Sequence, residues 1–166
     1  MKTRIDSIVL CPGAPDKEAL SFIEDACLHI QDGEILYAGP RAQAPAFEAD
    51  QRIDGKGNLA VPGLANTHTH IAMTLLRGFG GGLNLQDWLE KKVFPAEDRL
   101  TCAFARAGAM LGMAEMLRFG VTACSDMYFF MDETAEAAAL SGIRLVLSRA
   151  TLGNEEDDGG RLAEGE

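Results

Sequence analysis

Two of the chain's three histidines, His68 and His70, lie one residue apart in the stretch VPGLANTHTH, which spans residues 61–70. If this stretch is a β-strand, both side chains point to the same side and lie roughly 6.5–7 Å apart along the chain. Two imidazoles at that spacing can bind one metal ion together. The motif is short, so the pattern leaves an alternative open, in which the two histidines only make hydrogen bonds at a strand end.

The residues before this motif have the pattern of a small β-sheet. Short apolar runs alternate with turn residues, and Asp32-Gly33 joins two of these runs. An Asp-Gly pair in this setting predicts a hairpin, because both turn residues adopt positive φ easily. The stretch RIDGKGNLAVPG predicts a further strand pair around Gly55 and Gly57. We expect residues 1–60 to form one sheet unit of β-sandwich type, as part of a composite sandwich.

Strands and helices alternate from residue 61 onward. The spacing of apolar residues predicts a helix from Thr101 to Phe119, and Gly120 follows it where a helix-ending glycine is expected. The next predicted elements are the strand VTACSDMYFF, the helix DETAEAAALSG and the strand IRLVLSRA. Apolar strands that alternate with helices are typical of a parallel sheet covered by helices. We therefore predict an α/β fold, with residues 61–166 as its second domain.

The composition disfavours several classes of partner. The formal net charge is −10, from 15 Lys and Arg against 25 Asp and Glu. Nucleic acid and anionic membranes bind basic surfaces, so neither is expected as a partner. The four cysteines include no C-x-x-C pair, and the sequence shows neither a signal peptide nor an apolar run long enough to span a membrane. We expect a soluble, cytoplasmic protein with reduced thiols.

Three sequence blocks carry a resemblance to a known family. VPGLANTHTH, SDMYFFMDE and RLVLSRA occur in the order and spacing of the amidohydrolase superfamily, and they closely resemble its 5-methylthioadenosine/S-adenosylhomocysteine deaminases. The resemblance covers almost the whole chain. It implies the start of a metal-dependent (β/α)8 barrel, with about three barrel strands after the amino-terminal sheet. It also implies that His68 and His70 bind one divalent metal ion, for which Zn²⁺ is the first choice.

The resemblance assigns substrate contacts to three further residues. Glu97, in VFPAED, matches a glutamate that accepts hydrogen bonds from the ribose hydroxyls of a nucleoside, and a carboxylate suits a vicinal diol because charge-assisted bonds are strong. Arg149 matches an arginine that meets the carboxylate of a homocysteine moiety, which a planar guanidinium fits. Arg161 is a candidate for a second such contact. Without the family, Glu97 reads as a surface carboxylate and Arg149 as an arginine at a strand end.

Two other polar residues are expected to have structural roles. Asp126 lies in the predicted strand VTACSDMYFF, and a structural hydrogen bond is favoured over catalysis for its side chain. His29 alternates with apolar neighbours in the amino-terminal sheet, far along the chain from the H-x-H motif. We expect it to pack in that sheet.

Several residues that complete the active site of such deaminases have no counterpart here. The family also uses a third histidine from a later strand, an H-x-x-E glutamate and an aspartate from the last strand, whereas this chain has only His29 besides His68 and His70. We therefore expect the amino-terminal fragment of an enzyme that releases ammonia from S-adenosylhomocysteine or 5′-methylthioadenosine. Its barrel is expected to be truncated, the chain alone to be inactive, and no catalytic residue to be present beyond the metal ligands.

Two alternatives stay open at this point. Another hydrolase of the same superfamily, such as a guanine- or cytosine-type deaminase or a triazine chlorohydrolase, would share the metal motif, but Glu97 and Arg149 favour a substrate with a ribose. A non-catalytic truncated or split chain would need a second polypeptide that supplies the missing strands. The expected partners are a small nucleoside substrate and, for the full-length protein, further copies of itself. Exposed apolar sheet edges in a fragment would favour such association.

Overall fold

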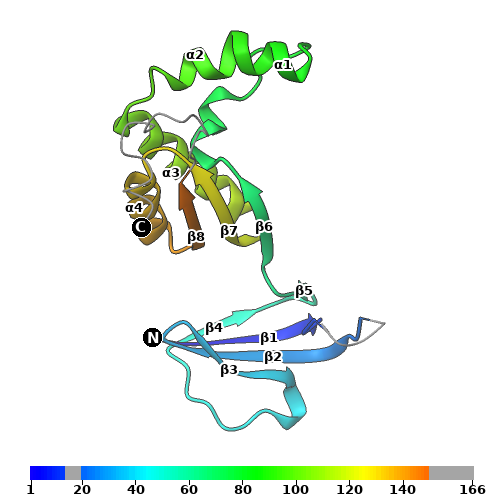
Figure 1. The fold of residues 1–166 in the computed structure, drawn as a ribbon. Helices are drawn as coiled ribbons and strands as arrows, with labels where there is room; N and C mark the ends of the chain where they lie inside the picture. Colours follow the sequence, from blue (N-terminus) through cyan, green and yellow to red (C-terminus); the bar gives the residue numbers. More distant parts are fainter. Residues whose placement is uncertain (14–19, 150–166) are drawn as a thin grey trace. The chain divides into compact units, whose positions relative to one another are not determined.

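The computed structural model describes residues 1–13 and 20–149 of the chain (Figure 1). The chain divides into two compact units, Met1–Pro62 and Gly63–Glu166. Each unit contains its own β-sheet, and helices longer than one turn occur only in the second unit among the described residues. The predicted α/β class is confirmed. The composite sandwich and the truncated barrel stay predictions.

The first unit is a five-stranded sheet with the order β3-β2-β1-β4, and β5 pairs with β1. Its elements are β1 Lys2–Leu10, β2 Ile23–Gln31, β3 Glu34–Pro40, the 3-10 helix η1 Arg41–Gln43, β4 Gln51–Asp54 and β5 Leu59–Ala60. β2 and β3 form the predicted antiparallel hairpin. Its turn residues Asp32 and Gly33 have φ values of 52° and 88°, which is the conformation that an Asp-Gly pair favours.

Two strands flank Gly55 and Gly57 as predicted, but they do not pair with each other. β4 and β5 both run parallel to β1, one after the other along its length. A Cβ atom added at Gly55 would lie 2.9 Å from the Asp6 carbonyl oxygen. The backbone therefore passes β1 at very short range, which only glycine permits, and continues along the same strand instead of turning back.

The interior of the first unit is small and apolar. Ile8, Leu10 and Ala26 are buried at its centre, and partly buried aliphatic residues pack around them. His29 is buried nearby, where its ring stacks on Phe47 with 4.4 Å between the ring centroids. This packing confirms the structural role expected for His29.

The second unit has a sheet of three parallel strands in the order β6-β7-β8. Its elements are β6 Leu64–Thr69, the 3-10 helix η2 Ile71–Leu76, α1 Leu85–Trp88, the π-helical turn η3 Leu89–Val93, α2 Phe94–Glu97, α3 Cys102–Arg118, β7 Val121–Tyr128, α4 Met131–Ser141 and β8 Arg144–Arg149. The strand-helix alternation agrees with the sequence prediction. The predicted helix Thr101–Phe119 is α3, whose first turn is capped by the Thr101 hydroxyl, which accepts from the Phe104 amide at 3.2 Å.

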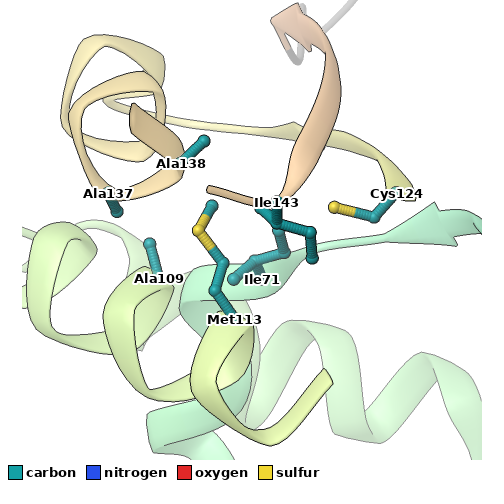
Figure 2. Packing of buried hydrophobic residues seen from close by; sticks show 7 residues of the cluster. All are labelled: Ile71, Ala109, Met113, Cys124, Ala137, Ala138 and Ile143. Atoms are coloured by element: carbon teal, nitrogen blue, oxygen red, sulfur yellow. The ribbon is translucent and has the colours of Figure 1, made fainter. Parts of the chain in front are cut away.

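One apolar cluster joins the helices of the second unit to its sheet (Figure 2). The buried members of this cluster are Ile71, Ala109, Met113, Cys124, Ala137, Ala138 and Ile143. The alanines lie where α3 and α4 face each other, so small side chains allow these helices to approach closely. α3 also approaches η2 closely, because a Cβ atom added at Gly108 would lie 2.9 Å from the Cα atom of Ala72. The segment that follows the H-x-H motif is thus fixed by a packed helix.

No single helix among the described residues has the length and apolar character of a membrane-spanning segment. The segments Leu85–Glu97 and Cys102–Arg118 pass such a test only when they are taken together, although they meet at an angle of 117°. The predicted cytoplasmic location stays a prediction.

Candidate metal and substrate site

The candidate residues of the second unit gather where its parallel strands end. His70 directly follows β6, Tyr128 is the last residue of β7 and Arg149 is the last residue of β8. In β7, alternate residues Cys124, Asp126 and Tyr128 are buried, as expected for side chains that point to one face of a sheet. The carboxyl ends of parallel strands are the usual location of active sites in α/β proteins.

The two histidines of the motif lie close together. Their ring centroids are 5.1 Å apart and the ring planes are inclined by 71°. His70 Nδ1 is hydrogen bonded to the Met127 carbonyl oxygen of β7. A carbonyl oxygen only accepts, so Nδ1 donates, and Nε2 is then the unprotonated nitrogen of the neutral ring. Metal-binding histidines are commonly oriented in this way by a backbone carbonyl.

This donor set fits a divalent metal ion such as Zn²⁺, which imidazole nitrogens bind well. Within residues 1–13 and 20–149, however, no group of three or more His, Cys, Asp or Glu side chains is arranged to hold a metal ion. The described part of the chain therefore offers two imidazoles, from His68 and His70. It brings no third protein ligand to them.

Asp126 supports the motif from the neighbouring strand. Its side chain is 0% exposed, and Oδ1 accepts a hydrogen bond of 2.8 Å from the Ile71 amide, the first residue after His70. Burial raises the pKa of the Asp126 carboxyl group, and the Ile71 hydrogen bond and the nearby His70 oppose that rise. The structural hydrogen-bonding role predicted for Asp126 is confirmed.

Glu97 and Arg149 line the same pocket, which has a volume of about 330 Å³. The rest of its lining is mainly apolar and consists of Phe94, Asp98, Leu100, Phe129 and Phe130. Glu97 ends α2 and Arg149 ends β8, so the fold unites two predicted substrate residues from separate elements. The third, Arg161, lies outside the described residues.

The aromatic lining of this pocket was not identified from the sequence. Phe129 and Phe130 directly follow β7, and Phe130 adopts a left-handed backbone conformation with φ 53° and ψ 51°. Two adjacent aromatic residues after a predicted strand could have indicated this lining, because loops at the carboxyl ends of parallel strands line active sites. Their flat faces are suited to contact with an aromatic ring of a ligand.

Burial is the main influence on the ionisation of Glu97. It raises the pKa of the carboxyl group, while Tyr128 and His70 act in the opposite direction. Tyr128 is 3% exposed, and its pKa is raised strongly, first by burial and then by the Glu97 carboxylate. Within the described part of the chain the Tyr128 hydroxyl has no hydrogen-bond partner of normal geometry, so its interaction with Glu97 is a looser contact. Tyr128 is buried, whereas Glu97 is half-buried at the pocket wall.

The raised pKa of Glu97 predicts that this residue makes stability depend on pH. A carboxyl group whose pKa is higher in the folded state favours folding most below its unfolded value, 4.5 for a glutamate, and this contribution is lost as the pH rises through the folded value. We therefore expect Glu97→Gln to raise the melting temperature at pH 7 and to change it little at pH 4. Thermal unfolding at both pH values measures this. Glu90→Gln, which changes an exposed carboxylate, should show no such difference, and an unchanged or lower melting temperature for Glu97→Gln at pH 7 would contradict the prediction.

Comparisons with known proteins identify the family of this chain. Residues 59–165 match the family model described as Amidohydrolase family. The chain is 46% identical over 145 residues to a 5′-deoxyadenosine deaminase of Methanosarcina mazei, and it covers 33% of that protein with 86% of its own length. It is 52% identical over 125 residues to a 5-methylthioadenosine/S-adenosylhomocysteine deaminase of Dictyoglomus thermophilum, where the alignment covers 75% of this chain and 29% of the relative. The chain thus spans about a third of the length of these curated relatives.

Two solved structures with bound zinc are also similar to this chain. An adenosine deaminase of Xanthomonas campestris with bound zinc matches with a TM-score of 0.80 and 32% identity, covering 87% of this chain and 33% of that one. An atrazine chlorohydrolase of Arthrobacter aurescens TC1, complexed with zinc, matches with a TM-score of 0.79 at 24% identity, over 94% of this chain and 38% of that one. The second likeness concerns the fold alone.

These matches confirm the resemblance on which the metal motif and the substrate residues were predicted. The family match includes the H-x-H motif, Glu97 and Arg149. The relatives named above as deaminases are matched over their amino-terminal portion. The chain belongs to the amidohydrolase family of hydrolytic enzymes.

Proposed function

We propose that this chain forms the amino-terminal part of a metal-dependent deaminase that acts on adenosine thioethers. The substrates would be S-adenosylhomocysteine and 5′-methylthioadenosine, and the reaction would release ammonia by hydrolysis. The names of the relatives support a nucleoside deaminase. Because the chain spans about a third of their length, the activity of the whole protein is part of the proposal.

His68 and His70 would hold the metal ion, most simply Zn²⁺, through their Nε2 atoms. When bound, the ion supplies the Lewis acidity that activates water for hydrolysis. The Met127 carbonyl oxygen keeps the His70 ring in the tautomer that ligation requires. The rings are also close enough, at 5.1 Å between centroids, to reach a common ion.

The observation that carries the substrate proposal is the shared pocket of Glu97 and Arg149. Glu97 would accept hydrogen bonds from the ribose hydroxyls, and Arg149 would bind the carboxylate of the homocysteine moiety through its planar guanidinium. The aromatic rings of Phe94, Phe129 and Phe130 would exclude water from the purine and contact its faces. Arg161 stays a candidate for a second contact to the substrate carboxylate.

Glu97 and Arg149 together favour an adenosine thioether over the substrates of the other hydrolases in the family. A guanine- or cytosine-type deaminase and a triazine chlorohydrolase act on substrates without a ribose, so neither needs an acidic acceptor for a diol. The likeness to the atrazine chlorohydrolase at 24% identity shows the fold alone. A non-catalytic chain that needs a second polypeptide would still present the same pocket, and it would differ in activity and not in ligand binding.

The role of Glu97 can be tested by ligand binding to the zinc-loaded chain. We expect Glu97→Gln to weaken binding of S-adenosylhomocysteine about tenfold or more, because a hydrogen bond to a charged group contributes about 1.5–3 kcal/mol. Binding of free adenine, which has no ribose, should change less than about twofold. Isothermal titration calorimetry with both ligands measures the difference.

Asp98→Asn is the matched control, since Asp98 lines the same pocket beside Glu97. It should leave the ratio of the two affinities unchanged. Equal losses for S-adenosylhomocysteine and adenine in Glu97→Gln would contradict the assignment of Glu97 to the ribose. The same loss in Asp98→Asn would move that role to the neighbouring carboxylate.

A further inference from the structure

We infer that Asp126 is a positioning residue for the metal site, because it fixes the backbone that carries His70. This inference rests on the proposed metal-binding role of His68 and His70. Asp126 itself is not a ligand in this account. It acts through the Ile71 amide, to which its Oδ1 atom is hydrogen bonded at 2.8 Å.

Asp126 acts at the start of η2. His70 is the N-cap residue of this 3-10 helix, with φ −125° and ψ 76°, and its own side chain caps no amide of the helix. The first amide groups of a helix have no acceptor within the helix. For Ile71, Asp126 of β7 supplies that acceptor from 55 positions away along the chain. The carboxylate therefore determines where η2 begins, and with it the conformation of His70.

The pairing of β6 with β7 is irregular near the two histidines. The regular register of this pair is interrupted between Asn66 and Thr69, and Thr69 is paired with Asp126 after the interruption. His68 lies within the interrupted stretch, and His70 follows Thr69, where β6 ends. Neither histidine is itself a paired residue of this ladder. β7 contacts the segment around His70 through the Asp126 side chain and the Met127 carbonyl oxygen.

Two neighbouring residues of β7 contact the chain at His70 and at the residue after it. Asp126 holds the amide that follows His70, and the Met127 carbonyl oxygen accepts from Nδ1 of its ring. If the backbone of His70 moved, its ring could not keep the contact to Met127. The loss of Asp126 should therefore release the ring from the tautomer in which Nε2 is free for a metal ion.

The burial of Asp126 is a further indication. Its side chain is 0% exposed, and Oδ2 has no hydrogen-bond partner of normal geometry among the residues described, although the Met127 amide also interacts with the carboxyl group. Burying a carboxyl group is costly unless its hydrogen bonds compensate for the lost water. Oδ1 can accept from Ile71 whether or not Oδ2 carries a proton, so an amide at this position could do the same. Substitution of Asp126 by asparagine therefore separates the need for a hydrogen-bond acceptor from the need for a negative charge.

The test compares three substitutions of Asp126 in the 166-residue chain, with Zn²⁺ affinity and the tautomer of His70 as the two measurements. Asp126→Ala removes the acceptor, and Asp126→Thr has a hydroxyl too short to reach the Ile71 amide but suits a strand. We expect both to weaken Zn²⁺ binding about 10–100-fold, as for other groups that orient metal ligands. Asp126→Asn retains an acceptor and should stay within about threefold of the unchanged chain. Competition with a chromophoric chelator measures the affinities.

The tautomer of His70 is read without metal from the ¹⁵N chemical shifts of its ring. We expect Nδ1 to carry the proton in the unchanged chain and in Asp126→Asn, and both tautomers to be populated in Asp126→Ala and Asp126→Thr. Cys124→Ala is the control, because Cys124 is buried on the same face of β7 two positions earlier. It should leave both measurements unchanged although it removes packing. Far-UV circular dichroism identifies any variant that fails to fold. If either Asp126→Ala or Asp126→Thr fails to fold, the other of these two variants is used in the comparison.

Several outcomes would overturn the inference. The first is that Asp126→Ala and Asp126→Thr leave both the Zn²⁺ affinity and the His70 tautomer unchanged. The second is that Asp126→Asn or Cys124→Ala lowers the Zn²⁺ affinity as much as these two variants do. If the unchanged chain binds no Zn²⁺, the proposed metal site is refuted. The positioning role of Asp126 is then tested by the tautomer of His70 alone. A His70 ring that keeps its proton on Nδ1 without Asp126 would then contradict the positioning role.

Discussion

Substitution of His68 or His70 by alanine is expected to lower the affinity of the chain for Zn²⁺ at least about tenfold, and substitution of both to abolish specific binding. The described residues bring these two imidazoles together, with 5.1 Å between ring centroids, and no further protein ligand joins them. Each histidine is therefore about half of the donor set. A single remaining imidazole loses the chelation that the pair provides.

The same variants also test the stabilising effect of the metal. A ligand that binds only the folded chain raises its stability, so Zn²⁺ should raise the melting temperature of the unchanged chain, and removal of Zn²⁺ by a chelator should reverse this. The double variant should not respond. Cys102→Ser is the control, because it removes an exposed thiol of the second unit, and thiolates also bind zinc. Zinc binding that survives in the double variant and is lost in Cys102→Ser would contradict the assignment.

Gly108→Ala is expected to destabilise the second unit by about 1–3 kcal/mol, the usual cost of overpacking. In a helix alone this change should stabilise, because alanine is the better helix former by about 1 kcal/mol. Here a Cβ atom would lie 2.9 Å from the Cα atom of Ala72 and still closer to its carbonyl oxygen. α3 and η2 would have to move apart, and η2 is the segment that directly follows the H-x-H motif. The measurement is urea unfolding, with the Zn²⁺ affinity as a second readout.

Gly81→Ala provides the comparison for that prediction. Gly81 has no positive φ, and a Cβ atom there would have a neighbour only at 3.8 Å. The change should leave the free energy of unfolding within about 0.5 kcal/mol of the original value. If Gly108→Ala raised stability as helix propensity alone predicts, the close packing of α3 on η2 would not hold.

The features that the sequence predicts well are those determined by near neighbours. Asp32-Gly33 specifies its hairpin because both residues tolerate positive φ. The helix predicted over Thr101–Phe119 forms as α3, Cys102–Arg118, although four of the five residues that it buries are alanine or glycine. The proximity of His68 and His70 was expected because alternate residues of a strand share a side, and their ring centroids lie 5.1 Å apart although His70 follows the last residue of β6. In each case the physical cause lies within a few residues of the element.

The features that escaped prediction depend on contacts between distant residues. The parallel pairing of β4 and β5 with β1 follows from a close approach at Gly55, which no local pattern reveals. The bond from Ile71 to Asp126 joins residues 55 positions apart. The segment between β6 and α3 combines 3-10, α and π turns, and such irregular backbone has no single period to detect. The pocket lining by Phe129 and Phe130 likewise depends on where the strand ends meet.

The central claim is that His68 and His70 together bind the metal ion of a nucleoside deaminase site. The most direct measurement is a crystal structure of the chain grown with Zn²⁺, with anomalous diffraction recorded on both sides of the zinc absorption edge. The account predicts one strong anomalous peak about 2.0–2.1 Å from Nε2 of both His68 and His70, with Nδ1 of His70 still donating to the Met127 carbonyl oxygen. A zinc ion bound elsewhere, or through Nδ1 of His70, would contradict it.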